Sequence, residues 1–348
     1  MVLASGLALL TASAALAHGG PDAGESPWLA WRLTPDIVLG TLLVAGLYIA
    51  GLRRRRARTG GARAERTRRL RHVSFFAGLA AIFLALQSPI DPIAERVFFI
   101  HQVQHLLLRV IGPMLLMLAA PQGLLRAGLP DVVRRGALRP ILRNRPLGVV
   151  FAVVAQPAVA TVLFIAALYF WQIPTYHNLA LRDDGVHYLM HVSLLFTGLV
   201  FFWRVFDPRP GPVGTRYGVR LMMLWVMVLS NIVIGAALAF KSGVLYTAYG
   251  DFGRLWHFTG LADEQLGAVT LWIPSSMMGL IAILIVVHMW GSHETGVETR
   301  RDTEAARRAH GERLRGQASK NRVMAMGFAA FVVAVFVAAI IAGLIRQA

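Results

Sequence analysis

The chain has 348 residues, of which 56% are hydrophobic and 15% are charged, and its formal net charge is +17. It contains no cysteine, which excludes disulfides, thiolate zinc sites and Cys-x-x-Cys metal carriers, so soft-metal chemistry would have to use His and Met. The apolar residues form runs long enough to cross a bilayer, and the composition therefore predicts an all-α, polytopic transmembrane helical bundle.

The first segment of the chain is apolar and resembles a leader. Residues 1–17 end in Ala15-Leu16-Ala17, a pattern typical of signal-peptide cleavage, although the usual basic start is missing and an uncleaved segment is the alternative. Cleavage would make His18 the first residue, and its free amine and imidazole could then bind copper(II). Otherwise His18 is an ordinary residue of a Gly/Pro-rich tail.

Eight further apolar segments predict about eight spans after this signal-like segment. They cover residues 35–52, 72–87, 99–120, 147–171, 186–206, 219–240, 266–290 and 323–345. The predicted organisation is a signal peptide at 1–17, a membrane domain with seven spans at 18–290, and a basic loop with a final span at 291–348.

The basic residues predict the orientation of these spans. Most of the 35 Lys and Arg residues lie in four segments between spans, at 53–71, 121–147, 204–220 and 291–322. Such clustering indicates topological charge, not a nucleic-acid surface, and places these segments on the cytoplasmic side of a bacterial-type inner (plasma) membrane. The N-terminus would then lie outside.

Two histidine pairs stand where predicted spans begin. His101 and His105 open the third span, and His187 and His191 open the fifth. Residues four apart share one helix face, and both spans enter from the predicted outer side, so we expect four imidazoles at matched depth. The alternative is that each ring only forms hydrogen bonds between helices, but ionisable groups within spans are usually functional.

Such a cluster could hold one metal ion, two ions or a haem. A haem takes axial ligands from opposite faces, which a pair on one helix cannot supply, so the spacing favours an ion, although one His from each helix could still hold a haem. Copper, zinc and iron all suit neutral imidazole. The Glu of a His-Glu-x-x-His hydrolase is replaced by Gln102 and Tyr188, and Glu-x-x-His is absent, so neither a zinc hydrolase nor a di-iron enzyme is expected.

Further residues are candidate ligands or candidate supports of ligands. Methionine favours copper because thioethers suit Cu(I), but Met is also an ordinary packing residue. The candidates are Met190, Met277, Met278, His177, His257, Asp263 and Gln265. His177 and His257 are expected in outer loops, where histidines are often solvated. Asp263 and Asp91 could favour a helix N-terminus or accept a proton from a ligating His. Arg109, inside the third span, is expected to face away from the site or to pair with an acid.

Four ordered motifs resemble a known family. They are Ser-Pro-Ile-Asp-Pro-Ile-Ala-Glu-Arg (88–96), His-Gln-Val-Gln-His-Leu-Leu-Leu (101–108), the His187/His191 pair leading into Leu-Leu-Phe-Thr-Gly-Leu-Val-Phe-Phe-Trp (194–203), and Leu-Ala-Asp-Glu-Gln-Leu-Gly with Leu-Trp-Ile-Pro (261–274). Over about residues 70–290 the chain resembles the multi-spanning CtaG family of cytochrome c oxidase assembly factors. That family is distinct from the single-span, cysteine-bearing copper chaperone that has shared the name.

The resemblance implies a role in maturing a haem-copper oxidase by handling copper on the outer side of the membrane. Oxidase subunits and a copper donor protein are the implied partners, beside the lipid bilayer. By position, His101, His105, His187 and His191 correspond to the family's paired histidines, and Asp263 and Gln265 correspond to its acidic/amide motif. Many members have Trp-His where this chain has Trp171-Gln172, so that ligand is missing unless His177 replaces it.

Two other functions compete with an assembly factor. A copper transporter would need ligands that continue to the cytoplasmic side, but His72, His288 and the mid-span methionines are too scattered to form a path. A haem-binding electron-transfer protein is the third alternative, and a visible absorption spectrum separates it from a copper site.

Overall fold

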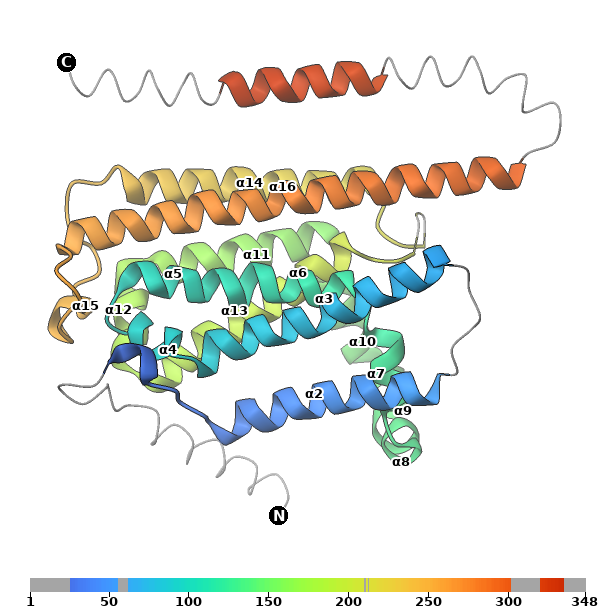
Figure 1. The fold of residues 1–348 in the computed structure, drawn as a ribbon, viewed down its shortest axis with the longest axis horizontal. Helices are drawn as coiled ribbons and strands as arrows, with labels where there is room; N and C mark the ends of the chain where they lie inside the picture. Colours follow the sequence, from blue (N-terminus) through green and yellow to red (C-terminus); the bar gives the residue numbers. More distant parts are fainter. Residues whose placement is uncertain (1–25, 56–61, 210, 212, 302–319, 335–348) are drawn as a thin grey trace. The chain divides into compact units, whose positions relative to one another are not determined.

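The structure is a computed structural model, and it describes residues 26–55, 62–209, 211, 213–301 and 320–334 (Figure 1). The described residues form helices and connecting turns without any strand, which confirms the predicted all-α class. The chain divides into two compact units, Met1–His288 and Met289–Ala348, and the first unit contains both histidine pairs. The predicted leader and His18 lie outside the described residues.

Among the residues that the structure describes, five helices are long and apolar enough to cross a membrane. They contain the first, second, fifth, sixth and seventh predicted spans, and they are α2 (Pro35–Arg54), α3 (Ala62–Gln87), α13 (Asp184–Val205), α14 (Tyr217–Ala239) and α16 (Gly260–Arg301). Two bent helix pairs raise the number to seven if each pair is one span. The predicted count of about eight is therefore not confirmed. Of the eighth predicted span, residues 323–334 are helical, and residues 335–345 lie outside the described residues.

The third predicted span changes its helix type midway. It consists of α5 (Phe98–Leu106), a π-helical turn (Leu107–Ile111) and α6 (Gly112–Leu118). Pro113 has no N–H, and its ring would clash with the carbonyl of Arg109 in a regular α-helix. The Gly112 N–H instead donates to the Leu107 oxygen, five residues back, so the π turn lets the span continue past the proline.

The segment around the fourth predicted span is not one straight helix. It forms α10 (Arg145–Val154) and α11 (Pro157–Gln172), which meet at an angle of 71°. The ring of Pro157 disfavours helical geometry at the residue before it, and Gln156 is accordingly extended, with φ −62° and ψ 136°. The predicted span over 147–171 therefore corresponds to a bent helix pair that is interrupted before this proline.

Short helices connect the long ones. They are η1 (Pro27–Leu29), α4 (Ile90–Ala94), α7 (Gln122–Gly128), α8 (Asp131–Val133), a π segment (Arg134–Leu138), α9 (Arg139–Arg143), α12 (Pro174–Arg182) and α15 (Ala248–Asp251). The helices α12 and α15 lie beside the histidine pairs, whereas α7 to α9 lie near the arginine-rich end of α2 (Figure 1). An added Cβ at Gly198 would lie 2.3 Å from the Arg109 oxygen, so this glycine lets α13 approach the π turn. The close approach holds the two histidine helices together.

Candidate metal centre

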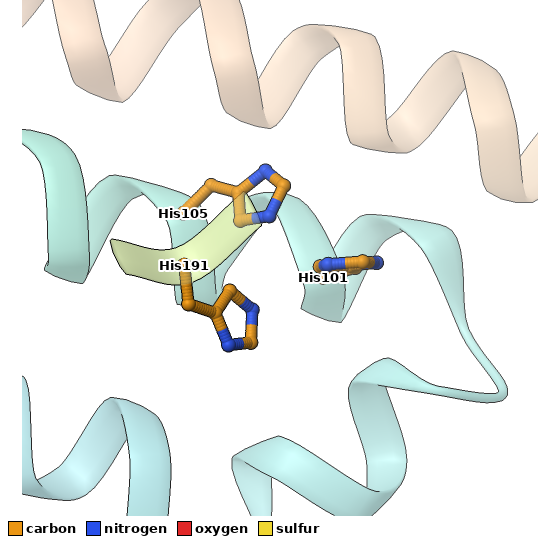
Figure 2. A group of neighbouring side chains, drawn as sticks. All are labelled: His101, His105 and His191. Carbon is orange, nitrogen blue, oxygen red and sulfur yellow. The ribbon is translucent and has the colours of Figure 1, made fainter. Parts of the chain in front are cut away.

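The two histidine pairs converge between α5 and α13. Figure 2 shows His101 and His105 on α5 and His191 on α13 with their rings close together. One ring nitrogen from each of these three residues lies within 4.8 Å of the others. The convergence expected from helical spacing and matched depth is therefore present for these three side chains.

His187 lies at the edge of this group. The centroid of its ring is 4.4 Å from that of His191 and 5.3 Å from that of His101. The rings of His101 and His105 are 4.3 Å apart, and those of His105 and His191 are 5.8 Å apart. The four imidazoles are thus neighbours by their ring centres, and the compact group of three is defined by the separations of ring nitrogens.

Several ring nitrogens in this group are buried without a hydrogen bond. Nε2 of His101, both nitrogens of His105 and Nε2 of His191 have no such partner among the residues that the structure describes. Leaving a buried polar atom unsatisfied costs free energy, and native proteins do it rarely. Interhelical hydrogen bonding therefore does not account for these nitrogens, whereas a bound cation would satisfy them.

Tyr249 connects the group to a fifth histidine. Its hydroxyl oxygen lies 2.6 Å from His101 Nδ1 and 2.8 Å from His177 Nε2. On its other side, Nδ1 of His177 lies 2.9 Å from the carbonyl oxygen of Trp171. The result is a chain of hydrogen bonds that runs from a backbone carbonyl to the first histidine of the cluster.

The protonation of these groups determines the donor and the acceptor in each of these hydrogen bonds. Burial lowers the pKa of His177 to about 4, so its ring is neutral at pH 7. A carbonyl only accepts, hence His177 Nδ1 carries the proton and its Nε2 accepts from the Tyr249 hydroxyl. The Tyr249 oxygen then accepts from His101 Nδ1–H, which leaves a lone pair on His101 Nε2. This is the tautomer that a metal ligand needs.

His177 thus differs from the solvated loop residue that the sequence predicted. It lies in α12, is fully buried, and has both ring nitrogens engaged. Gln172 stands where the resemblance led us to expect a histidine. Its side-chain N–H donates to Oε1 of Gln102 at 2.8 Å, and its Oε1 accepts from the Tyr246 hydroxyl at 2.9 Å. His177 therefore orients His101, and Gln172 ties α11 to α5.

Asp263, at the start of α16, holds the N-terminus of α5. Its two carboxylate oxygens accept the N–H groups of Phe98 and Phe99, both at 3.0 Å, and Arg254 lies 3.5 Å away. The first N–H groups of a helix have no partner within the helix, so a carboxylate there fixes its start. The sequence offered the N-terminus of its own helix as one alternative; Asp263 does lie in the first turn of α16, and its side chain also caps α5.

The sequence profile of the cytochrome c oxidase caa3 assembly factors matches residues 46–292, a range that includes α5, α13 and the start of α16. The chain belongs to this CtaG family. The match covers the motifs on which the resemblance rested.

Relatives of the chain occur in mycobacteria. Uncharacterized proteins of Mycobacterium bovis and Mycobacterium leprae are each 25% identical to it, over 319 and 282 residues. These alignments cover 86% and 79% of this chain but 47% and 41% of the relatives, so the chain spans less than half the length of the curated proteins that it matches. No solved structure matches it.

Other residues singled out in the sequence lie in varied surroundings. Met190 is buried in an apolar cluster with Trp171, Ala180 and Leu194. Met277 is exposed on α16 and Met278 is half-buried. The Gln265 amide donates to the Lys241 oxygen at 3.3 Å, Asp91 accepts from Gln104 at 2.7 Å, and His257 is exposed. Asp91, as an acceptor, and Gln265, as a donor, therefore link neighbouring segments of the chain through these hydrogen bonds.

Arg109 does not form the expected pair with an acid. Its side chain is buried, and no carboxylate pairs with it within the described part of the chain. Its guanidinium carbon instead lies 3.8 Å from the centre of the Phe164 ring. A cation stacked on an aromatic face replaces the expected ion pair. No local pattern indicates this contact, because Phe164 lies on α11, which meets the π turn only in the folded bundle.

Proposed function

We propose that this assembly factor binds a copper ion through His101, His105 and His191 and helps its insertion into a haem-copper cytochrome c oxidase. Family membership supports the role in oxidase assembly. The observation that carries the metal proposal is the group of three buried imidazoles with unsatisfied nitrogens. Oxidase subunits are the proposed partners, and a copper donor protein is the proposed source of the ion.

The donor set fits copper. Imidazole nitrogen binds copper well, and the chain has no cysteine that would favour a thiolate site. Tyr249 holds His101 with its Nε2 lone pair available, so the site can accept the ion without a proton leaving that nitrogen. His187, at the edge of the group, provides a fourth imidazole to which an ion could pass on entry or release.

The proposed location is the outer face of the inner membrane. The arginine-rich segments would face the cytoplasm by the positive-inside rule, and the histidine pairs begin spans that enter from the opposite side. Copper delivered there would reach the oxidase on its outer side. No catalytic step is proposed for the chain, because no carboxylate replaces Gln102 or Tyr188 next to the histidines.

Metal analysis tests the proposal. Wild type, His101→Ala/His187→Ala and His105→Ala would be purified in detergent, and bound copper and the visible spectrum would be measured. His257→Ala is the matched control, because His257 is exposed and outside the group. We expect copper in wild type and control and loss of copper from the two cluster variants.

Oxidase activity of the same membranes tests the role. We expect activity to fall with the copper content. Unchanged copper and unchanged oxidase activity in the cluster variants would refute both site and role. Copper loss with full oxidase activity would refute the assembly role alone. A Soret band in the wild-type spectrum would show that the site holds haem and not copper. Copper uptake into sealed vesicles by wild type, but not by the cluster variants, would favour the transporter.

A further inference from the structure

The arginine-rich end of α2 borders a cavity of about 510 Å³. Its lining residues come from the end of α2, from α7, and from the segment that leads into α9. They are Arg55, Gly123, Arg126, Ala127, Arg134, Leu138, Arg139 and Leu142. Half of the lining residues are arginines and none is acidic. We propose that this cavity, the arginine pocket, binds the phosphate group of an anionic phospholipid.

The charges in the arginine pocket are largely uncompensated. Arg134 pairs with Asp131, but Arg55, Arg126 and Arg139 form no ion pair with a carboxylate in the ranges that the structure covers. Like charges around one cavity repel each other, and a bound anion would relieve that repulsion. Guanidinium groups bind phosphate oxygens with paired hydrogen bonds, which makes phosphate a suitable anion.

Arg54 and Arg55 show that the pocket is more than a run of basic residues. Arg54 Nη1 donates to the carbonyl oxygens of Ala127 and Leu129, at 3.1 and 2.7 Å, and thereby ties α2 to the end of α7. The next residue, Arg55, directs its guanidinium over Gly123, where an added Cβ would lie 3.1 Å from Nη2. One arginine therefore has a structural role, and its neighbour lines the cavity above a position that has no side chain.

The surroundings of the pocket favour a lipid over a free phosphate. None of the described residues in α8, α9 and α10 is buried, and their apolar side chains are exposed, including Val132, Ile141, Leu142, Leu147 and Phe151. Helices with exposed apolar residues beside arginines are typical of a membrane interface. Leu138 and Leu142 line the pocket itself, so a lipid would cover them while its phosphate met the arginines.

Lipid retention tests the inference. The protein would be reconstituted in vesicles of phosphatidylcholine with or without phosphatidylglycerol, repurified in detergent, and analysed for bound phospholipid by mass spectrometry. We expect wild type to retain phosphatidylglycerol and not phosphatidylcholine. Arg126→Gln/Arg139→Gln should weaken retention about 30-fold, as expected for two arginine contacts. Arg53→Gln/Arg143→Gln, which removes two exposed arginines outside the lining, should retain it.

A second variant separates shape from charge. Gly123→Leu keeps every arginine but fills the space beneath Arg55, so it should also lose the lipid. Thermal unfolding in detergent would verify that each variant is folded. Equal retention by all variants, or equal retention of both lipids, would overturn the inference. Displacement of the lipid by millimolar inorganic phosphate would assign the pocket to a soluble anion instead.

Discussion

The molecule has two polar regions of opposite character. The histidine group between α5 and α13 is buried and braced by residues that are themselves bonded, including Tyr249, Asp263 and His177. The arginine pocket at the end of α2 is open, and among the described residues most of its arginines have no carboxylate partner. The difference indicates that one region is pre-positioned for a small ion and that the other requires an anion from outside.

The largest expected effect is on the bracing of the histidine region. Asp263→Ala leaves the N–H groups of Phe98 and Phe99 without their acceptor and removes one of the two carboxylates near Arg254, so it should lower the free energy of unfolding by about 3–5 kcal/mol. Thermal or denaturant unfolding in detergent measures this. Asp251→Ala, which removes an exposed ion pair with Arg182, should cost less than about 1 kcal/mol. Similar costs for both would remove the contrast between buried bracing and exposed pairing.

The next effect concerns the compact group itself. His105→Ala removes a member of the three-nitrogen group, whereas His187→Ala removes the ring at its edge. We expect Cu(I) binding, measured by competition with a chromogenic chelator, to be abolished in the first variant and only weakened in the second. A stronger loss for His187→Ala would show that the ion sits nearer to α13 than the three-nitrogen group suggests.

A smaller effect should follow from loosening His101 without removing it. Tyr249→Phe deletes the hydroxyl that joins His101 to His177, and losses of this kind typically weaken metal binding about 10–100-fold. Tyr246→Phe is the control, because its hydroxyl bonds Gln172 and not a clustered histidine. If both variants bind Cu(I) as wild type does, the Tyr249 bridge does not control the tautomer of His101.

The smallest effect belongs to the arginine region. Arg54→Gln breaks two bonds to backbone carbonyls and should lower stability by about 1 kcal/mol, while Arg55→Gln should leave stability nearly unchanged. Unfolding curves of the two variants measure the difference. Equal stabilities would mean that the division between a structural and a pocket-lining arginine is wrong.

Local patterns predicted the helical class, most spans and the convergence of the histidine helices. Apolar runs and four-residue spacing depend only on neighbours in sequence, so they could be read without the fold. Pro157 was equally visible in the sequence, and the bend before it could have been predicted. By contrast, His101 and Tyr249 are 148 residues apart, and no local pattern joins a tyrosine of the short helix α15 to a histidine of α5.

Asp263 is a second residue whose partner could not be identified from the sequence. Its position before a span predicted an interaction with a helix N-terminus, and the structure has one, but on a helix that begins 165 residues earlier in the chain. The kind of interaction followed from residue type, and the identity of the partner required the tertiary structure. The partner of Arg109 was not predicted for the same reason, since its aromatic partner comes from another helix.

The π turn after His105 sets the direction of the histidines. A π turn accommodates one more residue than the α-helical turn that it replaces. If residues 107–111 were wound as regular α-helix with every residue kept, α5 would rotate by about 100° relative to α6. His101 and His105 would then point away from α13 even though every side chain of the metal centre was retained. Rewinding this segment would therefore abolish the centre as surely as replacing a ligand.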